Sequence, residues 1–207
     1  MSFITAFFYD RFMAKAEEAC LQEWRKDLLM HVQGDVLEIG AGTGASLDVY
    51  PDGVNSLVLA EPDKHMRKIL KDKAAYYSFK EMQITSDTVE HLSFADASFD
   101  WVVASLVFCS VSNPNAGFME INRVLRSGGN FIFLEHVAAP PGTRRRRWQN
   151  GVTPIWRTFS GNCHLNRETE TALNAAGFTL KDIKRESMRK AMPIVRPTIR
   201  GIAQKAL

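Results

Sequence analysis

The hydrophobic positions of the chain form short apolar runs that alternate with segments of helical spacing. Runs of about four to eight residues that end in polar positions predict buried strands of a parallel sheet. The predicted strands cover residues 36–39, 54–60, 79–84, 98–105, 130–137, 178–184 and 195–205. Helical spacing covers residues 3–30, 64–74, 115–126 and 166–176, and a further helix is expected from about Ala45. This alternation predicts an α/β fold with right-handed crossovers.

The first predicted strand runs directly into a glycine-rich turn, Val36-Leu37-Glu38-Ile39-Gly40-Ala41-Gly42-Thr43-Gly44. Glycine lets the backbone take positive φ and approach a ligand closely. The spacing G-x-G-x-G differs from the G-x-G-x-x-G of dinucleotide sites. Glu38 would repel a pyrophosphate but attract a cationic ligand such as an amino-acid ammonium. A plain glycine turn is the alternative interpretation.

Polar residues end three further strands. Glu61 follows the second strand about 20 residues after the glycines, where Rossmann-type sites place the acid that accepts the ribose hydroxyls. Asp63 is the better N-cap of the next helix, which leaves Glu61 for a ligand, and Met66 is placed to pack on an adenine face. Ser105 and His136 end the fourth and fifth strands. Because ligands of open parallel sheets bind beyond the carboxyl ends of the strands, we expect the site at these tips.

The N-terminal segment carries apolar residues at helical spacing with charged residues between them. We expect this helix to cover the ligand as a lid or to pack on the sheet. Its early aromatic residues, Phe3, Phe7 and Phe8, make contact with a membrane surface the alternative. The chain is expected to form a single domain over residues 1–207, with residues 1–31 as the helical lid and 32–207 as the core.

Composition narrows the class of protein. The chain has 207 residues, of which 45% are hydrophobic, and this is ample for one core. Its three cysteines have the spacing of neither a disulfide framework nor a metal site, so we expect a reducing compartment and no metal. No stretch approaches the length of a membrane span and no signal peptide is visible, which favours a soluble cytoplasmic protein. Membrane association through the N-terminal helix stays open.

Charge is concentrated at one place. The net charge of +3 says little about partners, but Arg144-Arg145-Arg146-Arg147 is a dense basic run. Such a run can bind phosphate in RNA or on an anionic lipid. Four adjacent arginines on a helix point in different directions and no RNA-recognition motif accompanies them, so a solvated face is the preferred interpretation.

Together these segments resemble the Rossmann-like (class I) S-adenosylmethionine-dependent methyltransferases. The motifs that carry the resemblance are the glycine turn, Glu61 and residues 90–94, 98–102 and 122–129. The resemblance implies a seven-stranded, mostly parallel sheet with an antiparallel last strand and helices on both faces. It also implies S-adenosylmethionine as the cofactor and S-adenosylhomocysteine as its product.

A narrower resemblance reaches into the C-terminal third. Residues 106–111, 135–138, 148–149, 154–156, 161–168 and 195–197 are similar to the methyltransferase-like 7 group. Its animal members methylate alkyl thiols, which implies a thiol S-methyltransferase. They also carry a hydrophobic N-terminal membrane anchor, where this chain has only an amphipathic stretch. Many members of the wider superfamily have an aspartate at the position of Thr88, and Asp87 is out of register with it.

The cofactor residues expected from these motifs lie at the strand tips and in the turns that follow them. They are Glu38, Gly40, Ala41, Gly42, Thr43, Gly44, Glu61, Pro62, Met66, Asp87, Thr88, Val89, Ser105 and Leu106. We expect the backbone of Thr88 and Val89 to hold the adenine, with the Thr88 hydroxyl or Asp87 assisting.

Methyl transfer from a sulfonium requires alignment of acceptor and methyl group and exclusion of water. A thiol attacks as a thiolate, so the site must supply a base or lower the thiol pKa. We expect His136 to be the general base, with a structural role at the strand end as the alternative. Trp148, Trp156 and Phe159 are expected to wall an apolar acceptor pocket that Cys109 also lines, and core packing is the alternative.

The predicted substrate is therefore a small lipophilic acceptor, and a thiol is favoured. A phospholipid N-methyltransferase or a quinone C-methyltransferase would use the same cofactor scaffold. The non-enzymatic alternative is an inactive module that binds S-adenosylmethionine. We expect no nucleic-acid partner, and a monomer or a weak dimer.

Overall fold

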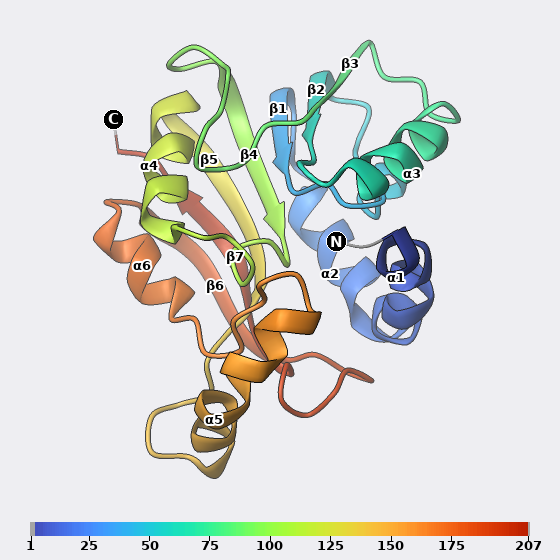
Figure 1. Ribbon diagram of the computed structural model, residues 1–207. Coiled ribbons are helices and arrows are strands. Elements are labelled where there is room, and N and C mark those ends of the chain that lie inside the picture. Colours follow the sequence, from blue (N-terminus) through green and yellow to red (C-terminus); the bar gives the residue numbers. More distant parts are fainter. Residues whose placement is uncertain (1–2, 207) are drawn as a thin grey trace.

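Seven strands form one sheet in the order β3-β2-β1-β4-β5-β7-β6 (Figure 1). The computed structural model describes residues 3–206, with side chains from residue 9 onward. The strands are β1 Gly34–Ile39, β2 Val54–Ala60, β3 Glu81–Thr85, β4 Phe99–Ser105, β5 Leu125–His136, β6 Thr179–Ser187 and β7 Pro197–Gln204. Strand β7 is antiparallel to β5 and to β6, whereas β1 to β5 pair in parallel. The predicted sheet, with its antiparallel last strand, is confirmed.

Helices cover both faces of the sheet (Figure 1). They are α1 Phe3–Ala16, α2 Gln22–Leu29, α3 Lys64–Ala74, α4 Pro114–Val124, α5 Arg144–Phe159 and α6 Thr169–Ala175. On one face, α4 and α6 bury Phe118 and Leu173 in a core with Phe131. On the other face, α2 and α3 bury Leu29 and Leu70 in a second core. Two cores thus hold the sheet rigid between them.

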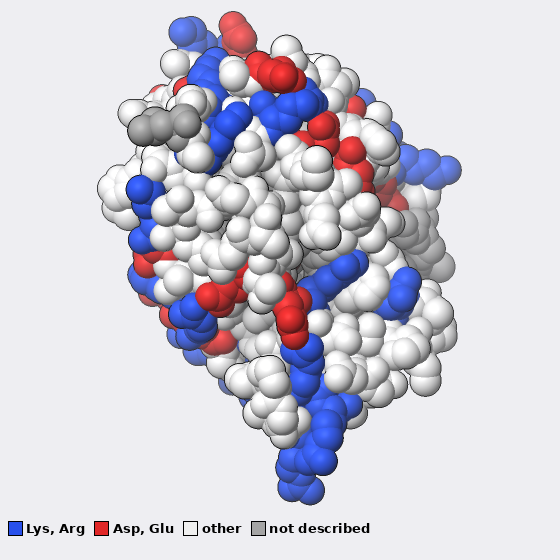
Figure 2. All heavy atoms as spheres, turned by 90° about the vertical axis from the view of Figure 1, so that its left-hand side faces the viewer, with Lys and Arg blue, Asp and Glu red and all other residues white. Residues whose placement is uncertain are grey.

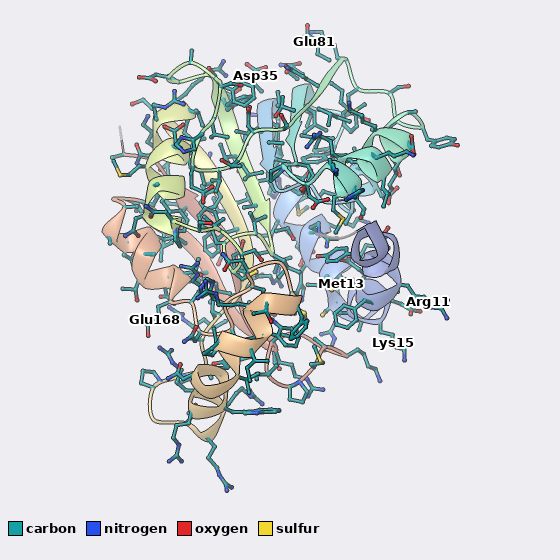
Figure 3. The ribbon with its side chains drawn as sticks, viewed as in Figure 1. Arg11, Met13, Lys15, Asp35, Glu81 and Glu168 are labelled. Carbon is teal, nitrogen blue, oxygen red and sulfur yellow. The ribbon has the colours of Figure 1, made fainter. Side chains whose placement is uncertain are left out.

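The N-terminal segment is helical, as predicted, but one part of it is wider than an α-helix. A π-helical segment, η1 Glu17–Leu21, joins α1 to α2. Met13 packs against the core, whereas Arg11 and Lys15 are exposed and point away from the body (Figure 3). The side chains of Phe3, Phe7 and Phe8, on which the prediction of membrane contact depends, lie outside the described residues. Among the described residues, no helix is long and apolar enough to cross a membrane.

The helix predicted from Ala45 does not form. Residues 42–46 make a turn, and only a three-residue 3₁₀-helix, η2 Leu47–Val49, follows it. Tyr50 is extended, with ψ of 132°, because the proline at position 51 disfavours a helical conformation in the residue before it. The glycine turn therefore leads into a second turn instead of an α-helix.

Two further boundaries differ from the prediction. Strand β5 begins at Leu125, which pairs with Phe99, so the Ser127-Gly128-Gly129 segment lies within the strand. Helix α6 begins at Thr169 and not at residue 166 as predicted, and the Asn166 side-chain amide donates to the Asn150 side chain. The predicted start of α3 is confirmed, since the Asp63 carboxylate accepts hydrogen bonds from the backbone of His65 and Met66.

Candidate active site

The glycine turn after β1 has the backbone conformation that its sequence requires. Gly40, Gly42 and Gly44 have φ values of 62°, 59° and 83°. A Cβ atom added to Gly40 would lie 2.6 Å from Val107 Cγ2, so the turn packs tightly against the segment after β4. Among the described residues, the atom nearest to a Cβ added to Gly42 is the Gly40 carbonyl oxygen, 3.9 Å away. The turn thus presents an open stretch of backbone beside a closely packed one, as a ligand-binding loop does.

Glu61 ties the end of β2 to the glycine turn. Its Oε2 accepts a hydrogen bond from the Gly42 backbone at 2.8 Å, and its Oε1 accepts one from the Asp63 backbone at 2.8 Å. The side chain is buried, and burial raises the pKa of its carboxyl group. Each carboxylate oxygen keeps a further lone pair with which it can accept a hydrogen bond from a ligand.

Glu38 lies beneath the same turn. Its carboxylate accepts hydrogen bonds from the Ser46 hydroxyl at 2.7 Å and from the Tyr50 hydroxyl at 2.9 Å. The side chain is buried, and burial raises the pKa of Glu38. A buried acid with a raised pKa is a favourable partner for a cationic group that enters the site.

A small cavity lies between the glycine turn and the N-terminal helices. Its volume is about 40 Å³. It is lined by Tyr9, Glu17, Arg25, Glu38, Gly40, Ala41, Gly42, Thr43, Ala45, Ser46, Ser105 and Leu106. Leu106 has a left-handed backbone with φ of 59°, a strained conformation for a leucine that is typical of functional sites. The tips of β1 and β4 therefore meet at this cavity, as the sequence predicts.

The N-terminal helices close the cavity through polar contacts. The Thr43 hydroxyl donates to the Asp10 carboxylate at 2.6 Å. The buried Arg25 guanidinium binds the Glu17 carboxylate through two hydrogen bonds, of 2.8 and 2.6 Å. The sequence analysis missed Asp10, Glu17 and Arg25, because a π-helical turn between the last two changes which side chains share a face.

The residues expected around adenine lie outside the lining of this cavity in the described structure. The Asp87 carboxylate accepts a hydrogen bond from the Ser93 hydroxyl at 2.8 Å, and the Thr88 carbonyl accepts one from the His91 backbone. Met66 and Val89 are buried in the protein. Pro62 and Gly44 also lie outside the lining.

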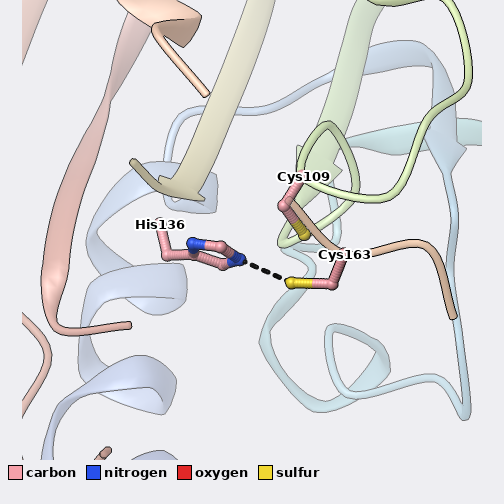
Figure 4. A group of neighbouring side chains, drawn as sticks. All are labelled: Cys109, His136 and Cys163. Atoms are coloured by element: carbon pink, nitrogen blue, oxygen red, sulfur yellow. Dashed lines mark hydrogen bonds between the residues drawn. The ribbon is translucent and has the colours of Figure 1, made fainter. Parts of the chain in front are cut away.

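Three soft side chains meet beyond the tips of β4 and β5 (Figure 4). Cys109, His136 and Cys163 are all buried, and Cys109 Sγ, a His136 ring nitrogen and Cys163 Sγ all lie within 4.8 Å of one another. The His136 Nε2 atom is 3.1 Å from Cys163 Sγ. Contact with Cys109 and then with His136 lowers the pKa of Cys163 against the effect of burial. We call these residues the Cys–His cluster.

The fold brings the Cys–His cluster together from three separate segments. His136 ends β5, Cys109 lies in the turn after β4, and Cys163 follows α5. The His164 backbone donates to the Cys109 carbonyl at 2.7 Å, which holds the last two segments together. Glu135 accepts hydrogen bonds from the Val107 and Phe108 backbone and so fixes the turn after β4.

The cluster borders the cavity. The Cys109 thiol lies 3.5 Å from the carbonyl oxygen of Leu106, and Leu106 lines the cavity. The sequence analysis expected Cys109 in the acceptor pocket and His136 as the base, and it left Cys163 out of the site. Cys163 lies in the segment 161–168 that carries the narrower resemblance, but no local spacing links it to His136, which lies 27 residues away on a different element.

Comparison with known proteins identifies the family. The model of a methyltransferase-domain family matches residues 37–133. Human thiol S-methyltransferase TMT1A is 36% identical over 173 residues, which cover 82% of this chain and 70% of the human protein. The chain belongs to the thiol S-methyltransferase family. It is an S-adenosylmethionine-dependent methyltransferase, as the sequence analysis predicts.

Solved structures share the fold of this methyltransferase. The YcgJ protein from Bacillus subtilis has a TM-score of 0.71 at 16% identity, covering 92% of this chain and 99% of that one. A geranyl diphosphate methyltransferase in complex with S-adenosylmethionine has a TM-score of 0.71 at 15% identity, covering 92% of this chain and 85% of that one. At these identities the likeness extends to the fold alone.

The methyltransferase does not assemble the predicted aromatic wall. Trp148 is 53% exposed and Phe159 is 81% exposed, because α5 turns this side of the helix outward. Trp156 is half-buried and lies beside Cys163, whose pKa it also helps to lower after Cys109 and His136. Of the three predicted wall residues, only Trp156 therefore lies beside the Cys–His cluster.

The arginine run forms the first turn of α5. Three of its four arginines are exposed, and Arg146 pairs with Glu168 at 2.6 Å. Figure 2 shows basic side chains gathered at the lower tip of the molecule, where Figure 1 shows α5. This arrangement agrees with the predicted solvated face.

A larger cavity of the methyltransferase lies elsewhere. Its volume is about 200 Å³, and residues of α4 and α6 line it together with Phe108 and Arg167. It does not reach the glycine turn. The strand tips around the glycine turn therefore remain the candidate active site because of their chemistry, although the cavity between α4 and α6 is larger.

Proposed function

We propose that this methyltransferase transfers the methyl group of S-adenosylmethionine to a small lipophilic thiol. The observation that carries the proposal is the Cys–His cluster beside the glycine-turn cavity, because it offers polarizable sulfur and a ring nitrogen where the acceptor must approach the methyl group. The name of human TMT1A, a thiol S-methyltransferase, supports the same acceptor.

The cofactor is proposed to lie along the strand tips. Glu61 accepts the ribose hydroxyls, and the open backbone at Gly42 faces the ligand. The ammonium group of the methionine portion pairs with Glu38, and its carboxylate pairs with Arg25. The remaining proposed contacts are Gly40, Ala41, Thr43, Gly44, Ser105 and Leu106 along the turns, and Pro62, Met66, Asp87, Thr88 and Val89 around the adenine.

Cofactor entry requires the N-terminal helices to move. Pockets for ligands of this size have volumes of roughly 300–1,000 Å³, far above the cavity between the glycine turn and α1. Among the residues whose side chains the structure describes, Thr43 contacts Asp10 of α1, and Glu17 of η1 pairs with Arg25 of α2 beside the cavity. We therefore propose that α1 and η1 act as a lid that opens for the cofactor and closes over it.

The reaction requires deprotonation of the acceptor before transfer. The thiol loses its proton, the thiolate sulfur forms a bond to the methyl carbon, and the bond from that carbon to the cofactor sulfur breaks. The products are a methyl thioether and S-adenosylhomocysteine. His136 is the proposed base, and it acts together with Cys163, whose sulfur it contacts.

A methyl-transfer assay with labelled S-adenosylmethionine tests this function. The acceptor panel contains sulfide, alkyl thiols, a phosphatidylethanolamine and a quinol, with mass detection of each product. We expect methylated thiols alone. A methylated lipid or quinol as the main product would overturn the thiol assignment. If no acceptor is methylated while calorimetry detects cofactor binding, the protein binds S-adenosylmethionine but does not methylate thiols, phosphatidylethanolamine or quinols.

A further inference from the structure

The Cys–His cluster has the composition of a soft-metal site. Thiolate and imidazole are ligands that suit zinc. The three ligand atoms lie within 4.8 Å of one another, and one pair is 3.1 Å apart. In a tetrahedral zinc site with two sulfurs and one nitrogen, the ligand atoms are separated by about 3.5–3.8 Å. The cluster therefore needs side-chain shifts of about 1 Å to take up the ion.

Among the described residues, no hydrogen bond orients His136 as the carboxylate of a catalytic triad orients its histidine. The catalytic histidine of a hydrolase triad is oriented by a carboxylate at its second nitrogen. The Nδ1 atom of His136 is buried and has no hydrogen-bond partner among the described residues. A bond from Nε2 to a metal would fix the ring, and the Nδ1 proton would then need an acceptor such as a water molecule, because the second nitrogen of a metal-bound histidine is normally hydrogen-bonded.

We propose that Cys109, His136 and Cys163 bind one zinc ion whose fourth position receives the acceptor thiol. Sites with three protein ligands and one open position are typical of catalytic zinc, whereas structural zinc has four protein ligands. The inference rests on the proposed function for the identity of the fourth ligand. The sequence analysis expected no metal because the three cysteines are scattered along the chain without the spacing of a metal site.

The zinc ion supplies the activation that a thiol acceptor needs. A thiol that coordinates zinc is deprotonated, and its proton passes to solvent. The zinc-bound sulfur then attacks the methyl carbon, and the bond to the cofactor sulfur breaks with its electron pair. The resulting thioether is neutral and a weaker ligand than a thiolate, so it leaves and frees the fourth position. In this reaction Nε2 stays bound to zinc, so the zinc ion promotes loss of the thiol proton and replaces His136 in the role of base proposed above.

Metal binding is measured first and without reference to activity. Untagged protein is titrated with zinc against a chromophoric chelator, and with cobalt, whose absorption reports thiolate ligands. We expect one ion per chain and a thiolate-to-cobalt absorption band. Cys109→Ser and Cys163→Ser should each lower zinc affinity by more than about 100-fold. This loss exceeds the one expected when a residue that only hydrogen-bonds a zinc ligand is replaced.

Cys20→Ser is the matched control. Cys20 is also a fully buried thiol, but it lies in η1, where it contacts the Arg189 backbone. This variant should bind zinc as the unchanged protein does. Calorimetry with S-adenosylmethionine checks that all variants are folded, because the cofactor contacts lie outside the cluster. Failure of the unchanged protein to bind zinc or cobalt, or equal affinity in all variants, overturns the inference.

Transfer assays then separate the inference from the proposed function. We expect chelation to abolish thiol methylation and zinc to restore it, and an added alkyl thiol to change the cobalt spectrum. Full thiol methylation by metal-free protein would overturn the zinc role and leave the proposed function intact. A zinc-loaded protein that methylates only a lipid or a quinol would overturn the proposed function, and with it the thiol as fourth ligand.

Discussion

The two halves of the proposed active site, one for the cofactor and one for the acceptor, are built in opposite ways. The cofactor half uses backbone groups of one continuous turn, supported by the carboxylates of Glu38 and Glu61. The acceptor half uses three buried side chains from three distant segments. The first half offers hydrogen-bond donors and acceptors that suit a polar cofactor, and the second offers the soft side chains that we propose activate a thiol. Cofactor binding and acceptor activation should therefore respond to different substitutions.

The largest expected effect comes from the acceptor half. His136→Ala should lower kcat for thiol methylation by about 100-fold or more, whether His136 is a base or a zinc ligand. The Kd for S-adenosylmethionine should stay within about 2-fold. Steady-state kinetics and calorimetry measure the two quantities. The exposed His31 provides the control His31→Ala. A loss of cofactor affinity as large as the loss of kcat would show that the halves are not separable.

The cofactor half should show the reverse behaviour. Glu61→Ala removes a carboxylate that holds Gly42 and Asp63 and that is proposed to accept the ribose hydroxyls. The Kd for S-adenosylmethionine should rise by about 10- to 100-fold, with kcat at saturation nearly unchanged. The control is Glu81→Ala, since Glu81 is exposed on β3 (Figure 3). Unchanged affinity in calorimetry would reject the role of Glu61.

The same contrast explains what the sequence could predict. The alternation of strands and helices, the glycine turn and the cap at Asp63 follow from patterns within a few residues. Local steric and hydrogen-bond requirements dictate these patterns, so they can be recognised in the sequence before the fold is known. Which residues form the Cys–His cluster depends on how three distant segments come together in the fold. The spacing of Cys163 in the sequence does not show that it lies beside His136.

Two expectations from the sequence were wrong, and in each case the surrounding structure decided against a local pattern. The helix from Ala45 was expected by analogy with other glycine turns, but the proline at position 51 leaves only one 3₁₀ turn. Trp148 and Phe159 have the apolar character of a pocket wall, yet the orientation of α5 exposes them. Apolar character alone does not tell which side of a helix meets the protein, because exposed apolar residues are common.

A pH series sharpens the comparison within the cofactor half. Burial raises the pKa of Glu38 above its ordinary value of 4.5, so the unliganded protein protonates this acid at a higher pH than an exposed acid would. A cationic ligand requires the ionised form. Cofactor affinity should therefore fall as the pH is lowered through the raised pKa. Glu38→Gln should weaken binding by up to about 10-fold at neutral pH and remove this dependence.

Calorimetry between about pH 5 and 8 measures the pH series for both proteins. Glu81→Ala is again the control and should follow the unchanged protein. Parallel pH profiles for the unchanged protein and Glu38→Gln would contradict the proposed pairing of Glu38 with the cofactor ammonium.

The smallest effect concerns the lid that spans the cofactor half. Asp10→Ala removes the acceptor of the Thr43 hydroxyl and with it one contact that holds α1 to the glycine turn. A partly exposed hydrogen bond contributes about 1 kcal/mol, so opening should become easier and the cofactor association rate should rise by about 2- to 5-fold. Stopped-flow fluorescence can follow this change, since Trp24 is buried in α2 near the cavity-lining Arg25.

Lys15→Ala is the matched control, because Lys15 lies on the same helix and points away from the body (Figure 3). It should leave the association rate unchanged. An Asp10→Ala protein that binds the cofactor at the original rate would mean that α1 does not limit entry. Slower binding would mean that Asp10 helps to admit the cofactor and does not hold the lid closed. Either result would leave Glu61 and the Cys–His cluster as the groups that define the two halves of the site.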